Sequence, residues 1–357
     1  MNHRQQLGSR SRTNRHSTIA RALRGSGLLL LAACAGRTAE STPGATRSTA
    51  STSRLPVVQQ ASLATSTGNL AGSIQLPASR APFPVVLIIA GSGPTDRDGN
   101  TPALPGTNNS LKLLAEGLAA QGIATLRFDK RGVGASATAA TTEAELRFTN
   151  YVDDAAAWAR QLRADPRFST LTIVGHSEGS LIGMVAAKQA GVDGLVSIAG
   201  AGRRPPEIIS EQLAAQLSKE IVARAQDIMK QIESGGKPDS IPPVLQPLFR
   251  PSVQPYLVSW FKFDPVVEIA ALDIPALIVQ GTTDLQIGQA DARRLASAYP
   301  AGRLVIVEGM NHVLKAAPAD RQQQMRSYMD PTLPVVPLLV SEVAAFVHTV
   351  KRKAPAP

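Results

Sequence analysis

The segment that most constrains the fold is residues 171–179, which read Leu-Thr-Ile-Val-Gly-His-Ser-Glu-Gly. Its β-branched start predicts a strand, and apolar residues at helical spacing, such as Leu181 and Val185, follow at once. The segment therefore predicts a strand, a sharp turn and a helix, with the pattern G-x-S-x-G at the turn. In such a turn Ser177 lies on strained backbone, exposes its hydroxyl and adjoins a helix N-terminus. We interpret Ser177 as a nucleophile; the alternative is an ordinary strand-to-helix turn.

Strand and helix patterns alternate along most of the chain. Residues 85–90 form an unbroken apolar run, as expected for a strand buried on both faces of a parallel sheet. Further strand patterns occupy residues 123–128, 195–199, 276–279 and 304–307, with helical periodicity between them. The alternation predicts an α/β fold with a doubly wound, mostly parallel sheet, and residues 61–76 predict an edge hairpin.

The alternation stops between residues 203 and 265. A long amphipathic helix is expected first, with Ile209, Ile221 and Ile232 on its apolar face, and a proline-broken aromatic stretch follows. Aromatic residues make up only 4% of the chain, so their density here suggests a helical lid over an apolar pocket. The alternative is that these side chains only pack the insertion against the rest of the molecule.

Residues 1–33 have the pattern of a signal peptide: six arginines, no acidic residue, and a short apolar run that leads to the single cysteine, Cys34. Residues 31–34, Leu-Ala-Ala-Cys, resemble the lipobox of bacterial lipoproteins, which implies lipid attachment at Cys34 and a membrane anchor. The expected location is the cell envelope, at the periplasmic face of the outer membrane. The alternatives are a secreted or periplasmic protein with an incidental cysteine, or a misplaced start codon.

The formal net charge of +10 depends largely on this N-terminal segment. Without residues 1–33 the charge falls to +4, and no arginine-rich face is visible in the rest of the sequence. We therefore expect no nucleic-acid partner. We also expect no metal and no cofactor, because the sequence has one cysteine, no paired histidines at ligand spacing and no phosphate-binding glycine loop.

A nucleophilic serine needs a base, normally a histidine held by a carboxylate. Of the five histidines, His3 and His16 fall in the predicted signal peptide, and His348 falls in the last helix pattern. His176 adjoins the serine, and we expect its side chain to point away from the face that the serine presents. His312 remains, in a loop directly after a strand, where sheets of this kind build their sites. The alternative for His312 is a packing or capping role.

The carboxylate is expected between the serine and the histidine in the chain. Asp284 follows the strand at residues 276–279 through Gly-Thr-Thr, in a loop at the strand's end. Asp264 and Glu268 precede that strand, so they are expected at its other end or in the lid. We therefore assign Asp284 as the residue that orients the histidine.

A tetrahedral oxyanion requires backbone N–H donors. One is expected from Glu178, directly after the nucleophile, and the other from Ser92 or, as a second choice, Gly93. Ser92 and Gly93 lie in the Gly-Ser-Gly-Pro loop after the strand at residues 85–90. The alternative is a glycine turn that only links a strand to a helix.

These features resemble the α/β-hydrolase superfamily, and within it bacterial serine esterases and serine-aminopeptidase-like hydrolases. Residues 91–100, Gly-Ser-Gly-Pro-Thr-Asp-Arg-Asp-Gly-Asn, resemble the segment that these hydrolases carry after their third strand. Residues 129–136, Asp-Lys-Arg-Gly-Val-Gly-Ala-Ser, are similar to a turn that is structural in the family. The resemblance covers residues 61–350 and implies the α/β-hydrolase fold with a Ser-Asp-His triad, without specifying the substrate.

We accordingly divide the chain into six parts. These are a signal peptide (1–33), a flexible tether (34–60), the first part of the hydrolase core (61–202), a helical lid insertion (203–265), the second part of the core (266–350) and a basic tail (351–357).

The expected activity is hydrolysis of small-molecule acyl esters through an acyl-enzyme, with Ser177 as nucleophile, His312 as base and Asp284 as its partner. The same chemistry would serve an aminopeptidase-like serine peptidase or an acyl thioesterase. An inactive hydrolase-fold binding lipoprotein is a further alternative. The sequence makes no prediction of acyl length, alcohol or oligomeric state.

Overall fold

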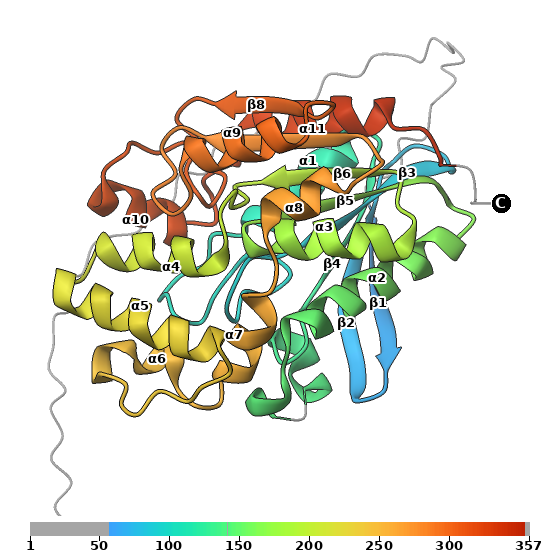
Figure 1. Ribbon diagram of the computed structural model, residues 1–357. Coiled ribbons are helices and arrows are strands. Elements are labelled where there is room, and N and C mark those ends of the chain that lie inside the picture. Colours follow the sequence, from blue (N-terminus) through green and yellow to red (C-terminus); the bar gives the residue numbers. More distant parts are fainter. Residues whose placement is uncertain (1–56, 141, 354–357) are drawn as a thin grey trace, which may run out of the picture. The chain divides into compact units, whose positions relative to one another are not determined.

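A computed structural model describes residues 57–140 and 142–353 (Figure 1). The predicted signal peptide, Cys34 and most of the predicted tether lie outside these residues. The tether was predicted to extend to residue 60, but β1 already begins at Val57. The extension arises because Val57 to Gln60 continue the antiparallel pairing with the next strand. No helix in the described part of the chain is long and apolar enough to cross a membrane.

The core is one eight-stranded sheet with the order β1-β2-β4-β3-β5-β6-β7-β8. The strands are β1 (Val57–Thr65), β2 (Gly68–Leu76), β3 (Phe83–Ile89), β4 (Ala124–Phe128), β5 (Phe168–His176), β6 (Gly194–Ile198), β7 (Ala276–Gly281) and β8 (Arg303–Val307). β1 and β2 form the predicted edge hairpin, and β2 pairs antiparallel with β4. All other neighbouring strands pair in parallel.

The helices follow the strands in alternation, with one long run of helices between β6 and β7. They are α1 (Ser110–Ala120), α2 (Phe148–Ala164), α3 (Glu178–Ala190), α4 (Pro205–Ala214), α5 (Lys219–Glu233), α6 (Gln246–Phe249), α7 (Gln254–Trp260), α8 (Pro265–Ala270), α9 (Gln289–Ala298), α10 (Arg321–Met329) and α11 (Pro337–Thr349). Short 3₁₀ turns are η1 (Gly134–Ala139), η2 (Glu143–Glu145) and η3 (Pro243–Leu245).

The sheet is covered on both faces, which explains the unbroken apolar run of β3. Val85 and Leu87 belong to a cluster that includes α2, α3 and α9, whereas Val86 and Ile88 belong to a second cluster with α1 and α11. Figure 1 shows α2 and α3 crossing the strands on one face. Because successive side chains of a strand point to opposite faces, a strand between two helix layers must be apolar at every position. The predicted doubly wound fold is confirmed.

The insertion between β6 and β7 has a hydrophobic cluster of its own, which includes Ile228, Phe249 and Leu257. The single long helix expected at its start is wrong, because two helices, α4 and α5, occupy this segment. The Ser218 side chain accepts a hydrogen bond from the Ile221 N–H and caps the second helix. A capping serine satisfies a free N–H of a new first turn, so the chain restarts a helix there.

Candidate active site

The sharp turn after β5 places Ser177 on strained backbone in front of α3. Its φ of 56° and ψ of −123° are unusual for a residue with a side chain. The flanking glycines allow the turn to be this tight. A Cβ atom on Gly175 would lie 2.2 Å from the Gly179 carbonyl oxygen, and one on Gly179 would lie 2.3 Å from the Ile89 carbonyl oxygen. Neighbouring backbone comes so close to these two residues that no side chain fits, so only glycine can occupy positions 175 and 179.

Asp284 and His312 meet at the same edge of the sheet, in the loops after β7 and β8. His312 Nδ1 lies 2.8 Å from Asp284 Oδ2, and both side chains are buried. The second carboxylate oxygen accepts hydrogen bonds from the backbone N–H groups of Gln286, at 2.8 Å, and Ile287, at 3.0 Å. These contacts fix the carboxylate, so His312 Nδ1 carries the proton and Nε2 is the nitrogen left for an acid–base role.

Burial alone would raise the pKa of the Asp284 carboxyl. The charge and hydrogen bond of His312, helped by the N–H groups of Ile287 and Gln286, outweigh burial and lower that pKa below its usual range. Asp284 is therefore ionised at neutral pH and can stabilise a protonated His312.

Ser177 and His312 line one cavity of about 310 Å³, together with the loop that contains Ser92 and Gly93. In the described part of the chain no hydrogen bond joins the Ser177 hydroxyl to the imidazole. Hydrogen bonds between a nucleophile and its base often tighten only when substrate binds. The cavity that Ser177 and His312 share is therefore the observation that brings the two residues together.

The three residues expected to hold the oxyanion also lie around Ser177. A Cβ atom on Gly91 would lie 3.1 Å from Ser177 Cβ, which shows how closely this loop approaches the serine. Ser92 and Gly93 line the cavity with Ser177, and Gly93 has a φ of +68°. Glu178 is the first residue of α3, so its N–H has no partner within the helix. Ser92, the first choice from the sequence, and Gly93, the second, both line the cavity with Ser177, so both stay candidates for the second donor.

His176 does not compete for the role of base. Its Nε2 donates a hydrogen bond to the His312 backbone carbonyl at 2.8 Å, because a carbonyl oxygen can only accept. Burial, followed by the nearby charge of His312, lowers the pKa of His176 to about 3. Although its ring lines the larger cavity with Ser177, His176 is neutral there and supports the loop that carries His312.

A buried polar cluster beside Ser177 was missed from the sequence. The fully buried Lys130 Nζ donates to the Gly91 carbonyl and lies 3.8 Å from Glu178 Oε2. The Tyr256 hydroxyl, from the insertion, donates to Glu178 Oε1 at 2.7 Å. Burial lowers the pKa of Lys130, although the charge of Glu178 opposes that effect. In the sequence Lys130 is one of several charged residues in a turn, and no pattern separates it from an exposed lysine.

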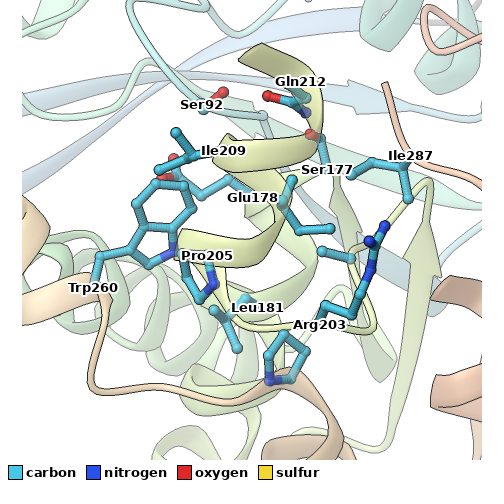
Figure 2. A pocket seen from close by; sticks show the side chains of 13 residues that line it. Ser92, Ser177, Glu178, Leu181, Arg203, Pro205, Ile209, Gln212, Trp260 and Ile287 are labelled. Carbon is cyan, nitrogen blue, oxygen red and sulfur yellow. The ribbon is translucent and has the colours of Figure 1, made fainter. Parts of the chain in front are cut away.

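A second, smaller cavity of about 60 Å³ also borders Ser177 (Figure 2). It shares Ser92 and Ser177 with the larger cavity. Its other walls are mainly apolar and come from α3, α4, the end of α7 and the loop after β7, and include Leu181, Ile209, Trp260 and Ile287. Among residues 57–140 and 142–353, no cluster of three or more His, Cys, Asp or Glu side chains could hold a metal.

Comparison with known proteins is consistent with this arrangement. Residues 107–241 match the family described as serine aminopeptidase, S33. Esterase EstD from Thermotoga maritima is 28% identical over 250 residues, which cover 69% of this chain and 58% of that protein. The match therefore spans less than two thirds of that relative's length.

Solved structures share the fold at low sequence identity. Est1E from Butyrivibrio proteoclasticus superposes with a TM-score of 0.52 at 16% identity, covering 81% of this chain and 98% of that chain. Its complex with ferulic acid gives a TM-score of 0.51 at 16% identity, covering 79% and 95%. The sheet order, the strand–turn–helix at Ser177 and these matches lead to one conclusion: the chain has the α/β-hydrolase fold.

Proposed function

We propose that this protein is a serine hydrolase of carboxylic esters. Ser177 Oγ passes its proton to His312 Nε2 and attacks the ester carbonyl carbon, which forms a tetrahedral oxyanion. The C–O bond to the alcohol then breaks, and the alcohol leaves with the proton from His312. Water gives a proton to His312 and attacks the acyl-enzyme carbonyl; the bond to Ser177 Oγ then breaks, His312 returns the proton to Oγ, and the acid is released. Asp284 keeps the imidazole in the required tautomer, and the N–H groups of Glu178 and of Ser92 or Gly93 hold the oxyanion.

The observation that supports this proposal most is the meeting of these groups at one edge of the sheet. Ser177 follows β5, and the Asp284–His312 hydrogen bond joins the loops after β7 and β8, with His312 and Ser177 lining the same cavity. An inactive scaffold would have no requirement for a buried, oriented carboxylate–imidazole pair beside a half-buried serine. The similarity to a protein named as an esterase also supports ester hydrolysis.

A serine peptidase is the second candidate, because the matching family is described as aminopeptidase. An aminopeptidase needs a free carboxylate near the nucleophile to bind the amine of its substrate. Glu178 is adjacent, but Oε1 accepts from the Tyr256 hydroxyl, and Oε2, which has no hydrogen-bond partner, lies 3.8 Å from the Lys130 ammonium. Because the buried charge of Glu178 already faces the charge of Lys130, the geometry supports ester cleavage better than release of an N-terminal residue.

The proposal is tested by comparing p-nitrophenyl esters with aminoacyl p-nitroanilides, using purified protein and its Ser177→Ala variant. We expect hydrolysis of the esters, and a loss of about 10⁴- to 10⁶-fold in kcat in the variant without a change in the unfolding transition. Faster turnover of the anilides would favour the peptidase. Ester hydrolysis that survives in Ser177→Ala would exclude the serine mechanism.

A further inference from the structure

The two cavities that border Ser177 differ in size and in the side chains that line them. If the proposed ester hydrolysis holds, the leaving alcohol must lie beside His312, because His312 Nε2 gives it a proton as the C–O bond breaks. His312 lines the larger cavity only, whereas Ser177 and Ser92 line both. The alcohol therefore occupies the cavity of about 310 Å³, which leaves the cavity of about 60 Å³ for the acyl chain.

The acyl side is small and lined by well-packed side chains. Its apolar walls include Ile209, which is 8% exposed, and Ile287, which is 3% exposed, and Figure 2 shows Ile209 and Trp260 close to Glu178. The charged groups that reach this cavity are paired: Glu178 binds Tyr256, and Arg203 binds Asp291 through two hydrogen bonds. A cavity of about 60 Å³ is small beside the cavity of about 310 Å³ and suits a short acyl group.

The alcohol side is larger, and its polar groups are neutral. Hydroxyl and amide groups of Thr95, Thr101, Asn108, Gln286 and Tyr328 line it, and no Asp, Glu, Lys or Arg side chain of the described residues does. Its volume of about 310 Å³ is within the range of small-molecule sites. Neutral hydrogen-bonding groups suit a hydroxylated alcohol and would not neutralise a phosphorylated one. We infer that the substrates are acetyl-sized esters of neutral, hydroxyl-rich alcohols, such as a sugar unit.

The acyl half of this inference is tested with p-nitrophenyl esters from acetate to decanoate. For the wild type we expect kcat/KM to fall at least 10-fold between acetate and hexanoate. Ile209→Ala should lessen that fall by 10-fold or more, because it removes a wall of the small cavity. Leu104→Ala is the matched control: it truncates an apolar wall of the larger cavity and should leave the acyl profile unchanged. Ile209→Val provides a milder change if the alanine variant does not fold.

The alcohol half is tested with acetylated methyl glucoside against ethyl acetate. We expect a higher kcat/KM for the sugar ester, and a loss of that preference in Tyr328→Phe combined with Thr101→Val. Serine-dependent hydrolysis that favours octanoate or decanoate over acetate, or ethyl acetate over the sugar ester, would overturn the inference alone. Absence of any ester hydrolysis, together with failure of a fluorophosphonate to label Ser177, would instead overturn the proposed function.

A second inference rests on a different observation, the contact between Lys130 and the Gly91 carbonyl. The Gly91 carbonyl and the Ser92 N–H belong to one planar trans peptide, so they point in opposite directions. An ammonium bound to the oxygen draws electron density from the N–H and fixes the plane of the peptide. The geometry points to Lys130 as a positioning residue that holds and polarises the Ser92 N–H toward the oxyanion.

The surroundings of Lys130 fit this role. Its side chain is 1% exposed, and its Nζ lies 5.1 Å from the centre of the Tyr151 ring. The nearest carboxylate is that of Glu178, whose own N–H is the other expected oxyanion donor. Both predicted donors, the N–H groups of Ser92 and Glu178, therefore lie next to one buried charge pair, Lys130 and Glu178. Tyr256, from the insertion, donates a hydrogen bond to the carboxylate of this pair.

The test compares Lys130→Met, which keeps length but removes charge and donors, with Lys130→Gln, which keeps a neutral donor. With active sites counted by fluorophosphonate titration, we expect kcat to fall about 10- to 100-fold in Lys130→Met, with KM within 2-fold, and less in Lys130→Gln. This range is below the 10²- to 10³-fold loss expected for removal of a direct donor. A kcat per titrated site within 2-fold of wild type in both variants would reduce Lys130 to a structural role.

Discussion

At the scale of single residues, Asp284 illustrates how burial and charge are balanced in the candidate site. Its carboxylate has lost most of its contact with water, a change that favours the protonated form. His312 and two backbone N–H groups reverse that preference and keep the carboxylate ionised. An ionised, fixed partner is what an imidazole needs in order to accept a proton from Ser177 and remain correctly oriented.

Asp284→Asn should lower kcat by about 10³- to 10⁴-fold, because an amide that donates to Nδ1 places the imidazole proton on Nε2, the nitrogen that must act as base. The measurement is steady-state hydrolysis of a short p-nitrophenyl ester, with circular dichroism to verify the fold. A variant that keeps more than a tenth of wild-type kcat would show that another carboxylate serves His312.

His176 provides a residue-scale prediction about pH. The pKa of His176 is lowered to about 3 in the folded protein, against 6.5 for an ordinary histidine. Below pH 6.5 the unfolded chain therefore binds a proton at His176, whereas the folded chain binds that proton only below about pH 3. Its contribution to stability is present above pH 6.5 and is lost as the pH falls through this range.

His176→Gln keeps an N–H donor for the His312 carbonyl but does not titrate. Between pH 7 and pH 5 the free energy of unfolding of the wild type should fall by about 2 kcal/mol more than that of the variant. Urea unfolding at the two pH values gives the comparison. Parallel losses in the two proteins would mean that His176 is protonated, or accessible, in the folded state.

At the scale of elements, the end of β4 anchors the loop that contains Ser92. The Asp129 carboxylate accepts from the Arg97 backbone N–H at 2.8 Å and binds the Arg97 guanidinium at 2.7 Å. The Arg127 guanidinium binds Asp98 of the same loop, and Lys130 binds the Gly91 carbonyl. The turn at residues 129–136 was predicted to be structural. The contacts of Asp129 and Lys130 show which segment this turn holds, namely the loop at residues 91–100.

Asp129→Ala should lower the free energy of unfolding by about 3 kcal/mol, because it leaves the Arg97 guanidinium and two backbone N–H groups without their acceptor. The matched control is Glu143→Ala, whose ion pair with Arg250 has side chains about 40% exposed on each partner. An exposed pair of this kind should contribute less than about 1 kcal/mol. Urea unfolding of both variants tests the contrast, and equal losses would contradict the anchoring role.

Prediction from sequence succeeded for elements whose patterns are local. Apolar runs gave the buried strands, because two helix layers require every position of β3 to be apolar. The predicted loops of Asp284 and His312 do meet, because loops after neighbouring parallel strands reach one edge of the sheet; the catalytic roles of the two residues stay a prediction. The break between α4 and α5 was missed, because the apolar face continues across it and only the cap at Ser218 marks the new helix.

Other features could not be predicted because they join distant parts of the chain. Lys130, Glu178 and Tyr256 lie far apart in sequence, and only the folded sheet and the insertion bring them into contact. The size of the small cavity depends similarly on how α4 and Trp260 pack over Ser177. Such contacts follow from tertiary packing, which composition and periodicity do not encode.

At the scale of the whole molecule, the catalytic core and the N-terminal segment pose separate questions. The sheet and the candidate active site lie within residues 57–353, whereas the proposed anchor depends on Cys34 and the lipobox-like residues before it. We propose that Cys34 is lipidated and that the protein is anchored in the cell envelope, with the outer membrane as the expected site.

Cys34→Ser should move the protein from the membrane to the soluble fraction of a Gram-negative host and abolish incorporation of labelled fatty acid. Ester hydrolysis by the released protein should remain within 2-fold of wild type, since the variant leaves the candidate active site unchanged. Continued membrane association without the cysteine would contradict lipid anchoring. Labelling at another residue would contradict the assignment to Cys34.

The central claim is that Ser177 is a nucleophile activated by His312 and Asp284. The most direct measurement is intact-mass and peptide analysis after reaction with a fluorophosphonate, carried out on the wild type and on His312→Ala. We expect one phosphonyl group per molecule, located on Ser177, and labelling at least about 10³-fold slower in the variant. A folded wild type that takes up no label, or takes it up on another residue, would contradict the account.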